Sequence, residues 1–263
     1  NHLDRHKNLR NYIQAKENIF KNQRKDDIVI LNSEDPVVRR MAGKAKSKVL
    51  FFSKLPLTEG VFLKAGRILR KAKSRQTVLA DRKEFPLRGD HNLENILAAA
   101  AVASLWNVSK NVIQKTLESF RTLEHRIEPV GELAGVRFVN DSKSTTLNST
   151  RAALLATPGP IVLVAGGRDK GSDFSEIEAL VRERVKKAVL YGEAREKIAG
   201  SWKLFNTCHT EKNFADAVKA AFEEAAPGDA VLLSPMCTSF DQFSSFEERG
   251  ETFKKIFQEL GKK

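Results

Sequence analysis

The sequence predicts an α/β protein whose second half contains a mostly parallel sheet, and three observations support this class. Residues 160–165 and 230–233 are continuous apolar runs, as expected for strands buried on both faces of a sheet. Turns rich in glycine or hydroxyl groups follow them, at 166–171 and 234–245. Segments of helical periodicity separate the runs. Such alternation is typical of a parallel sheet, because parallel strands need a crossover connection.

The first half of the chain is predicted to surround a second sheet with helices. The apolar periodicity predicts helices over 8–20, 35–44 and 108–120, and an alanine-rich helix from 89 onward. Asp35-Pro36 is a start signal for the second of these. We expect strands over 27–32 and 48–52, with short strands covering the sheet edge between 59 and 85.

The second half is predicted to begin with two strands in 130–139, around a turn at Ala134-Gly135. A helix is then expected from near Thr145. Further strands are expected over 187–191 and 203–205, in addition to the two apolar runs. The remaining helices are predicted over 174–184, 194–200, 213–226 and 246–260.

Composition narrows the class of protein without deciding its function. The chain has 263 residues, of which 41% are hydrophobic and 30% charged, which suits packed cores and a polar surface. It contains neither an apolar run of membrane-spanning length nor a secretory signal. Cys208 and Cys237 alone do not indicate a secreted disulfide scaffold, so we expect a cytoplasmic protein. The net charge of +12 suits anionic partners such as nucleotides or nucleic acid. Because the basic residues are spread along helices, we interpret them as solvated faces. We also expect a monomer with neither nucleic-acid nor membrane partners.

The most specific motif is SPMCTSFDQFSSFEERG at 234–250. A polar turn between a buried strand and a helix is a common ligand position in α/β sheets, although a surface loop rich in serine is an equally good physical reading. The wording resembles SPACASxDQFxxFExRG of the Mur ligases, in the branch that adds D-glutamate to UDP-N-acetylmuramoyl-L-alanine. The resemblance implies that Ser239, Phe240 and Phe246 line a D-glutamate pocket. Phe246 can equally be the first core residue of the last helix.

The first twenty residues resemble the middle, ATP-binding domain of the same family. HLDRH followed by YIQAKENIF is similar to HxDRH…Y..AK..I. The resemblance implies that His2 binds a magnesium ion, and that Lys16, carbamylated by CO₂, helps to position a second one. A carbamate is an oxygen anion of the hard type that magnesium prefers. Without the resemblance, Lys16 would be a solvated helix lysine and His2 a frayed terminal residue.

Two further motifs suggest nucleotide contacts. GDHNLEN at 89–95 resembles the family's GxHNxxN, which implies that Asn92 and Asn95 contact the adenine and nearby groups. The alternative for Asn92 is a helix cap. TLEHRIE at 122–128 resembles the hinge GLxHRxE, which implies that Arg126 reaches the ATP. A bidentate guanidinium suits phosphate, and the alternative is an ordinary surface salt bridge.

Two loops of the second half complete the expected site. NDSKSTT at 140–146 resembles NDSKATN, which implies that Asp141 and Lys143 contact nucleotide phosphate or metal and that Thr145 contacts D-glutamate. Thr146 replaces the usual asparagine and receives no role. The start of the following helix also favours anions. GGRDKG at 166–171 resembles GGxDKG, which implies that Lys170 binds a D-glutamate carboxylate.

The resemblance implies two domains. Residues 1–122 are expected to be the later part of the central ATPase domain, and residues 123–263 a Rossmann-like C-terminal domain. A P-loop of the GTNGKT type is not found in the sequence, nor is a domain for the uridine nucleotide. We therefore expect the first sheet to be incomplete, with an exposed edge, and this chain alone to be incomplete for turnover.

The implied function is ATP-dependent joining of D-glutamate to UDP-N-acetylmuramoyl-L-alanine in peptidoglycan precursor synthesis. The reaction would pass through an acyl phosphate and use ATP and Mg²⁺, with His2, Lys16 and Lys143 as catalytic residues. One alternative is another Mur ligase or a ligase like folylpolyglutamate synthase. Others are a non-catalytic amino-acid-binding fragment that lacks the P-loop and, on charge alone, a nucleic-acid-binding protein.

Overall fold

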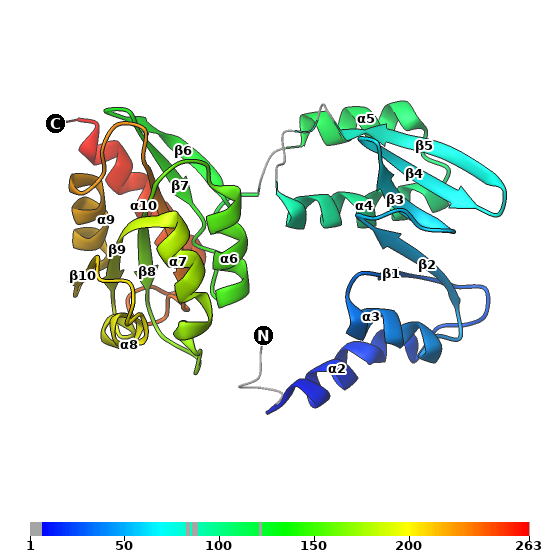
Figure 1. Cartoon of the computed structure of the whole chain (residues 1–263), viewed down its shortest axis with the longest axis horizontal. Helices are drawn as coiled ribbons and strands as arrows, with labels where there is room; N and C mark the ends of the chain where they lie inside the picture. Colours follow the sequence, from blue (N-terminus) through cyan, green and yellow to red (C-terminus); the bar gives the residue numbers. More distant parts are fainter. Residues whose placement is uncertain (1–6, 83–84, 86–88, 121–122, 263) are drawn as a thin grey trace. The chain divides into compact units, whose positions relative to one another are not determined.

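The protein is described by a computed structural model that covers residues 7–82, 85, 89–120 and 123–262. The chain divides into two compact units at residues 121–122 (Figure 1). Each unit has its own sheet and its own hydrophobic core, so each is described by itself.

The first unit is built on a five-stranded mixed sheet in which the strands lie in sequence order. The strands are β1 (Ile28–Asn32), β2 (Lys48–Ser53), β3 (Gly60–Lys64), β4 (Arg67–Ala72) and β5 (Arg75–Asp81). The first three are parallel, whereas β3, β4 and β5 pair antiparallel. The short strands between 59 and 85 therefore extend the sheet at one edge, as predicted, and β1 forms the other edge.

The helices of the first unit match the predicted segments closely. They are α2 (Leu9–Glu17), η1 (Asn18–Phe20), α3 (Pro36–Met41), η2 (Ala42–Lys44), α4 (Asp90–Leu105) and α5 (Lys110–Ser119). Asp35 caps α3, because its carboxylate accepts hydrogen bonds from the N–H groups of Val37 and Val38 at 2.8 and 3.0 Å. The alanine-rich α4 packs on the sheet, where Leu97 and Ala101 are fully buried beside Val61.

The second unit is built on a six-stranded sheet in the order β10-β9-β8-β11-β7-β6. The strands are β6 (Glu128–Leu133), β7 (Val136–Asn140), β8 (Ile161–Gly166), β9 (Val185–Tyr191), β10 (Cys208–Glu211) and β11 (Ala230–Met236). Every neighbouring pair is parallel except β6 with β7. Ala134 and Gly135 connect this hairpin with φ angles of 51° and 77°, as a type I′ turn requires. The predicted mostly parallel sheet is confirmed.

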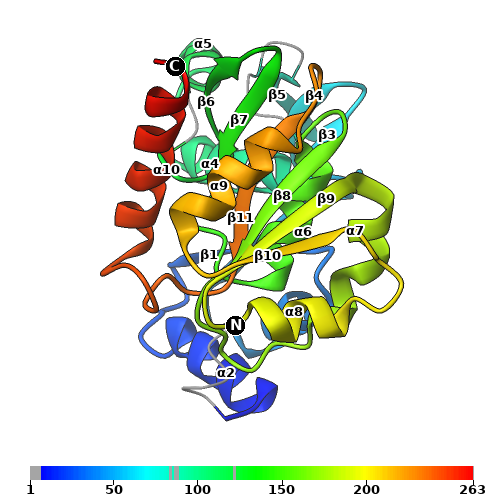
Figure 2. The ribbon, with the colours of Figure 1, turned by 90° about the vertical axis from the view of Figure 1, so that its left-hand side faces the viewer.

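Helices cover both faces of this sheet (Figure 2). One face carries η4 (Phe174–Ile177), α6 (Leu147–Ala156), α7 (Glu178–Arg184) and α8 (Arg195–Ser201); the other carries α9 (Phe214–Glu223) and α10 (Phe246–Leu260). The continuous apolar strands follow from this arrangement, since side chains on both faces of β8 and β11 are buried. Every helix in the described part of the chain is too short or too polar to cross a bilayer.

One predicted strand is wrong. Residues 203–205 lie in a connection, and the edge strand is β10 at Cys208–Glu211, which pairs with β9. Phe205 is buried in this connection, where its ring packs edge-to-face on the buried Trp202 with 5.9 Å between the ring centroids. The apolar residues of this connection therefore report burial in the core rather than strand structure.

Candidate functional site

The predicted ligand residues of the second unit lie in loops at one edge of its sheet. Strands β7, β8, β9 and β11 are parallel, so their carboxyl ends meet at the same edge. In open α/β sheets this edge is where ligands bind. The loop after β7 carries Asp141, Lys143 and Thr145, the loop after β8 carries Lys170, and the loop after β11 carries Ser239 and Phe240.

Asp141 is buried and its carboxylate is fully engaged. Its Oδ2 accepts a hydrogen bond from the hydroxyl of Ser234 at 2.8 Å, and its Oδ1 accepts one from the N–H of Ile127 at 3.1 Å. Its own N–H donates to the carbonyl of Leu233 at 2.8 Å. Asp141 therefore joins the ends of β7 and β11 to the turn that carries Arg126.

The turn at Arg126 has an unusual backbone. Its neighbours His125 and Ile127 have φ angles of 63° and 46°, in the left-handed region that favours glycine. Such strain persists only where surrounding contacts impose it. Here Asp141 holds Ile127, and the carbonyl of His125 accepts the N–H of Lys143 at 3.0 Å. The strained turn leaves the side chain of Arg126 exposed.

Lys143 and Phe246 lie close together at this edge. The Lys143 ammonium is 5.4 Å from the centroid of the Phe246 ring, within cation–π range. Phe246 is the first residue of α10 and is half-buried, and its ring also packs edge-to-face on His125 at 6.1 Å. Phe246 thus combines a structural contact with a place beside an exposed cation.

The loops after β8 and β11 are joined by backbone hydrogen bonds. The N–H of Arg168 donates to the carbonyl of Thr238 at 2.9 Å, and the N–H of Thr238 donates back at 3.0 Å. Ser239, the next residue, is buried, whereas Phe240 is 58% exposed. Lys170 is exposed as well. Three of the residues expected to bind D-glutamate thus lie on the two coupled loops, although they differ widely in exposure.

Helix α6 begins two residues later than predicted. Thr146 is its N-cap, and the hydroxyls of Thr146 and Ser149 form a capping box at the first turn. Thr145 lies just before the cap and is half-buried. Thr146, which received no role, has a structural one.

The other predicted residues belong to the first unit or lie outside the described residues. Lys16 is exposed on α2, with its ammonium 5.3 Å from the centroid of the Tyr12 ring. Asn92 and Asn95 lie one turn apart on α4, half-buried and exposed respectively. The N-cap of α4 is Gly89, so the alternative in which Asn92 caps this helix is wrong. His2 lies outside the described residues.

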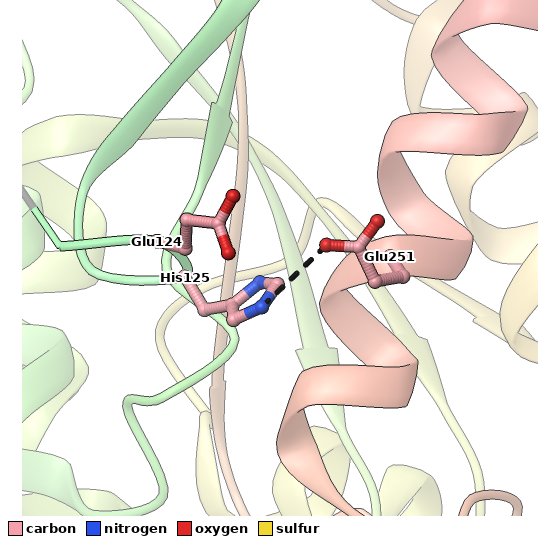
Figure 3. A group of neighbouring side chains, drawn as sticks. All are labelled: Glu124, His125 and Glu251. Atoms are coloured by element: carbon pink, nitrogen blue, oxygen red, sulfur yellow. Dashed lines mark ion pairs between the residues drawn. The ribbon is translucent and has the colours of Figure 1, made fainter.

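A second group of ligand-type side chains lies beside the Arg126 turn. Ligand atoms of Glu124, His125 and Glu251 are within 4.8 Å of one another (Figure 3). However, the Lys254 ammonium lies 2.7 Å from Glu251 and 3.6 Å from Glu124, so a lysine already balances this acidic cluster. The side-chain amide of Asn140 also donates a hydrogen bond to Nδ1 of His125 at 3.0 Å. We therefore interpret these side chains as structural contacts that hold the Arg126 turn in place, and not as a metal site.

Asp141 is expected to make stability depend on pH. Burial raises its pKa from 3.8 to about 6, although hydrogen bonds from Ser144 and Ser234 oppose the shift. Folding therefore favours the protonated carboxyl: this contribution is complete below about pH 4 and is lost as the pH rises through about 6. We expect the free energy of unfolding of Asp141→Asn, minus that of the wild type, to rise by roughly 3 kcal/mol between these limits and then level off.

Urea unfolding at a series of pH values tests this expectation. The chain has two tryptophans, Trp202 buried in the second unit and Trp106 exposed in the first. In a Trp106→Phe background, the fluorescence of Trp202 reports the unit that contains Asp141. A difference between variant and wild type that does not change with pH would contradict the assignment.

Sequence reasoning did not single out three side chains that organise this edge. Ser234 holds Asp141, His125 supports the Arg126 turn, and Arg249 is completely buried among the loops. All three lie within motifs quoted above. The sequence gives the residue types, but it does not indicate that a particular serine, histidine or arginine will be buried.

The chain is thus an α/β protein of two units, one of which carries cationic and hydroxyl side chains at the sheet edge where such folds bind ligands. Comparison with known families is consistent with this class. Residues 1–103 match the Mur ligase middle domain, and residues 125–237 match the Mur ligase glutamate ligase domain. The chain therefore belongs to the Mur ligase family and contains its middle and C-terminal domains.

Individual relatives are similar along almost the whole chain. A UDP-N-acetylmuramoylalanine–D-glutamate ligase of Thermoanaerobacter sp. (strain X514) is 45% identical over 98% of this chain, and one of Desulfitobacterium hafniense is 44% identical over 97%. The chain spans 58% and 57% of these relatives. The crystal structure of a MurF ligase from Thermotoga maritima in complex with ADP has a TM-score of 0.66 at 17% identity, covering 98% of this chain and 60% of that one. That similarity shows the fold.

Proposed function

We propose that the complete protein carrying this chain is an ATP-dependent ligase that joins D-glutamate to UDP-N-acetylmuramoyl-L-alanine in cytoplasmic peptidoglycan precursor synthesis. The observation that carries the proposal is 45% identity, over 98% of the chain, to a ligase of this name. The loops at the carboxyl edge of the second sheet support it, because they bring together cations and hydroxyl groups suited to phosphate and carboxylate. We further propose that the enzyme acts as a monomer.

In the proposed reaction, the L-alanyl carboxylate attacks the γ-phosphorus of ATP and ADP leaves, which gives an acyl phosphate. The amine of D-glutamate then attacks the acyl carbon. The tetrahedral intermediate collapses to the amide, with loss of phosphate and a proton. Phosphoryl transfer depends mainly on positioning and charge neutralisation. Lys143 and Arg126, both exposed cations at the same edge, are assigned to the nucleotide phosphates, and Asp141 orients the Arg126 turn.

The assigned nucleotide and magnesium residues of the first unit are chemically suited to their roles. Asn92 and Asn95, one turn apart on α4, offer amides for the adenine. Lys16 is exposed, so its amine is accessible to CO₂, and the resulting carbamate would be a hard oxygen ligand. His2 and the Lys16 carbamate are therefore the proposed magnesium ligands. A bound magnesium ion would neutralise charge on the transferring phosphoryl group.

D-glutamate is assigned to the two coupled loops after β8 and β11, to Thr145 in the loop after β7 and to Phe246 at the start of α10. Its two carboxylates need cations and hydroxyl donors, which Lys170, Thr145 and Ser239 supply. Phe240 and Phe246 supply apolar contact for the aliphatic chain. The 58% exposure of Phe240 leaves its ring available to a ligand. The amine would then be held for attack, which is where positioning contributes most to the rate.

The proposal is tested with the complete protein, ATP, Mg²⁺ and UDP-N-acetylmuramoyl-L-alanine, by following phosphate release and the amide product. We expect D-glutamate to support turnover, and L-glutamate and diaminopimelate to fail. The same assay with folate and L-glutamate addresses the alternative of a folylpolyglutamate synthase-like ligase. Turnover with another amino acid, or binding of D-glutamate without turnover, would replace the proposal by one of its alternatives.

A further inference from the structure

The side chain of Arg249, on the first turns of α10, is a completely buried cation at the ligand edge. Its Nε donates to the hydroxyl of Ser142 at 2.9 Å, and its Nη2 donates to the carbonyl of the same residue at 2.7 Å. Its Nη1 donates to the hydroxyl of Tyr191 at 3.1 Å. Both terminal nitrogens lie 3.3 Å from the carbonyl oxygen of Cys237.

These partners come from the carboxyl ends of three different strands: two lie in the loops after β7 and β11, and the third ends β9. Ser142 lies between Asp141 and Lys143, and Tyr191 is the last residue of β9. Cys237 begins the loop that continues into Ser239 and Phe240. A single guanidinium therefore connects the two loops that carry most of the proposed D-glutamate residues. Because it is planar and its donors point in fixed directions, it sets the distance between these loops.

The guanidinium of Arg249 donates its hydrogen bonds to neutral acceptors. Its hydrogen-bond acceptors are two hydroxyls and two carbonyls, and burial raises the pKa of Tyr191 to about 12, so the phenol stays neutral. Asp241 is the nearby acid whose charge also reaches Tyr191, but its Oδ2 accepts the N–H of Glu193 at 3.2 Å. Burying a cation without a hydrogen-bonded carboxylate is costly. The cost of burying this cation is offset by the neutral acceptors of the loops that it connects.

We propose that Arg249 is a positioning residue for D-glutamate. It fixes the loop of Lys143 and Thr145 relative to the loop of Ser239 and Phe240, and its charge adds to the attraction for a dicarboxylate. The proposal rests on the function proposed above. It predicts that changes at Arg249 act chiefly on the KM for D-glutamate, whereas a purely structural role would reduce the amount of folded enzyme and so lower the apparent kcat.

The test compares Arg249→Lys and Arg249→Met in the complete protein. Methionine removes the charge and all five donors, and we expect it to raise the KM for D-glutamate by about tenfold or more. Lysine keeps the charge but cannot bridge both loops, so its effect should be intermediate. The KM for ATP should change less than that for D-glutamate in both variants.

Arg137→Met is the matched control. Arg137 also donates to backbone carbonyls, those of Pro158 at 2.6 Å and Gly228 at 3.4 Å, but it lies near the start of β7, away from the ligand edge. We expect this variant to lose stability with no change in the KM for D-glutamate. Equal KM values for D-glutamate in Arg249→Met, Arg137→Met and the wild type would overturn the proposal.

Tyr191→Phe keeps the test decisive if Arg249→Met does not fold. It removes one acceptor of Nη1 while leaving the ring in the core, and we expect the KM for D-glutamate to rise by about threefold. An unchanged KM in both Tyr191→Phe and Arg249→Lys would refute the positioning role. A wild-type protein that fails to ligate D-glutamate would instead contradict the proposed function, so the two failures are distinguishable.

Discussion

Replacing Lys16 with alanine is expected to lower the ligase rate of the complete protein by about 10²-fold or more, as loss of a group that stabilises transition-state charge typically does. The change removes the proposed carbamate and with it a magnesium ligand. Lys16 is exposed on α2, and the proposed carbamate presents the same two oxygens as a carboxylate. Short carboxylic acids such as acetate should therefore partly restore the rate. Steady-state kinetics with and without added acid measure both effects.

Lys21→Ala is the matched control, since Lys21 is also exposed and lies just after the same helical segment. It should leave the rate unchanged. A second readout is independent of activity: ¹³C NMR after incubation with labelled bicarbonate should show a carbamate carbon in the wild type and not in Lys16→Ala. A full rate for Lys16→Ala would remove the carbamate from the mechanism.

Replacing Gly166 with alanine is expected to destabilise the second unit by roughly 3 kcal/mol or more. Gly166 ends β8 with a φ angle of 133°, which side chains of L-residues rarely adopt. A Cβ added there would overlap the backbone carbonyl of Tyr191, which belongs to the neighbouring strand and cannot move aside. Urea unfolding followed by Trp202 fluorescence, in the Trp106→Phe background, measures the loss.

Gly200→Ala is the control for this experiment. Gly200 lies inside α8, and an added Cβ would meet no heavy atom within 4 Å. Alanine has the higher helix propensity, so this variant should gain roughly 0.5–1 kcal/mol. The two variants should thus change the free energy of unfolding in opposite directions. This comparison tests whether close packing of the backbone is the reason that β8 must end in a glycine. Equal effects at the two positions would rule out that explanation.

The sequence was sufficient to predict the elements wherever a pattern had one physical cause. The runs at 161–166 and 230–236 are apolar throughout because helices cover both faces of the sheet. The helix over 246–260 is amphipathic and has a serine cap, and its predicted bounds match the structure. The prediction failed at 203–205, where apolar residues pack in the core from a connection rather than from a strand.

The candidate site was predictable only as a set of residue types. The motifs indicated that Asp141, Lys143 and Ser239 belong to ligand loops, because their wording is long and specific. The sequence did not reveal that Asp141 is buried, a condition that raises its pKa to about 6. Burial depends on which chain segments pack over a residue, and those segments are distant in sequence: Ser234, which holds Asp141, is separated from it by 93 positions.

The sequence by itself thus determined the two α/β units and the loops that carry charge and hydroxyl groups. These are properties of local periodicity, turn chemistry and motif wording. Only the tertiary structure decided which loops share an edge and what holds them there. Arg249 bonds to Ser142, 107 positions away in the chain, and to Tyr191, 58 positions away. Such pairings depend on strand order, which places β11 between β8 and β7 and is set by packing of the whole sheet.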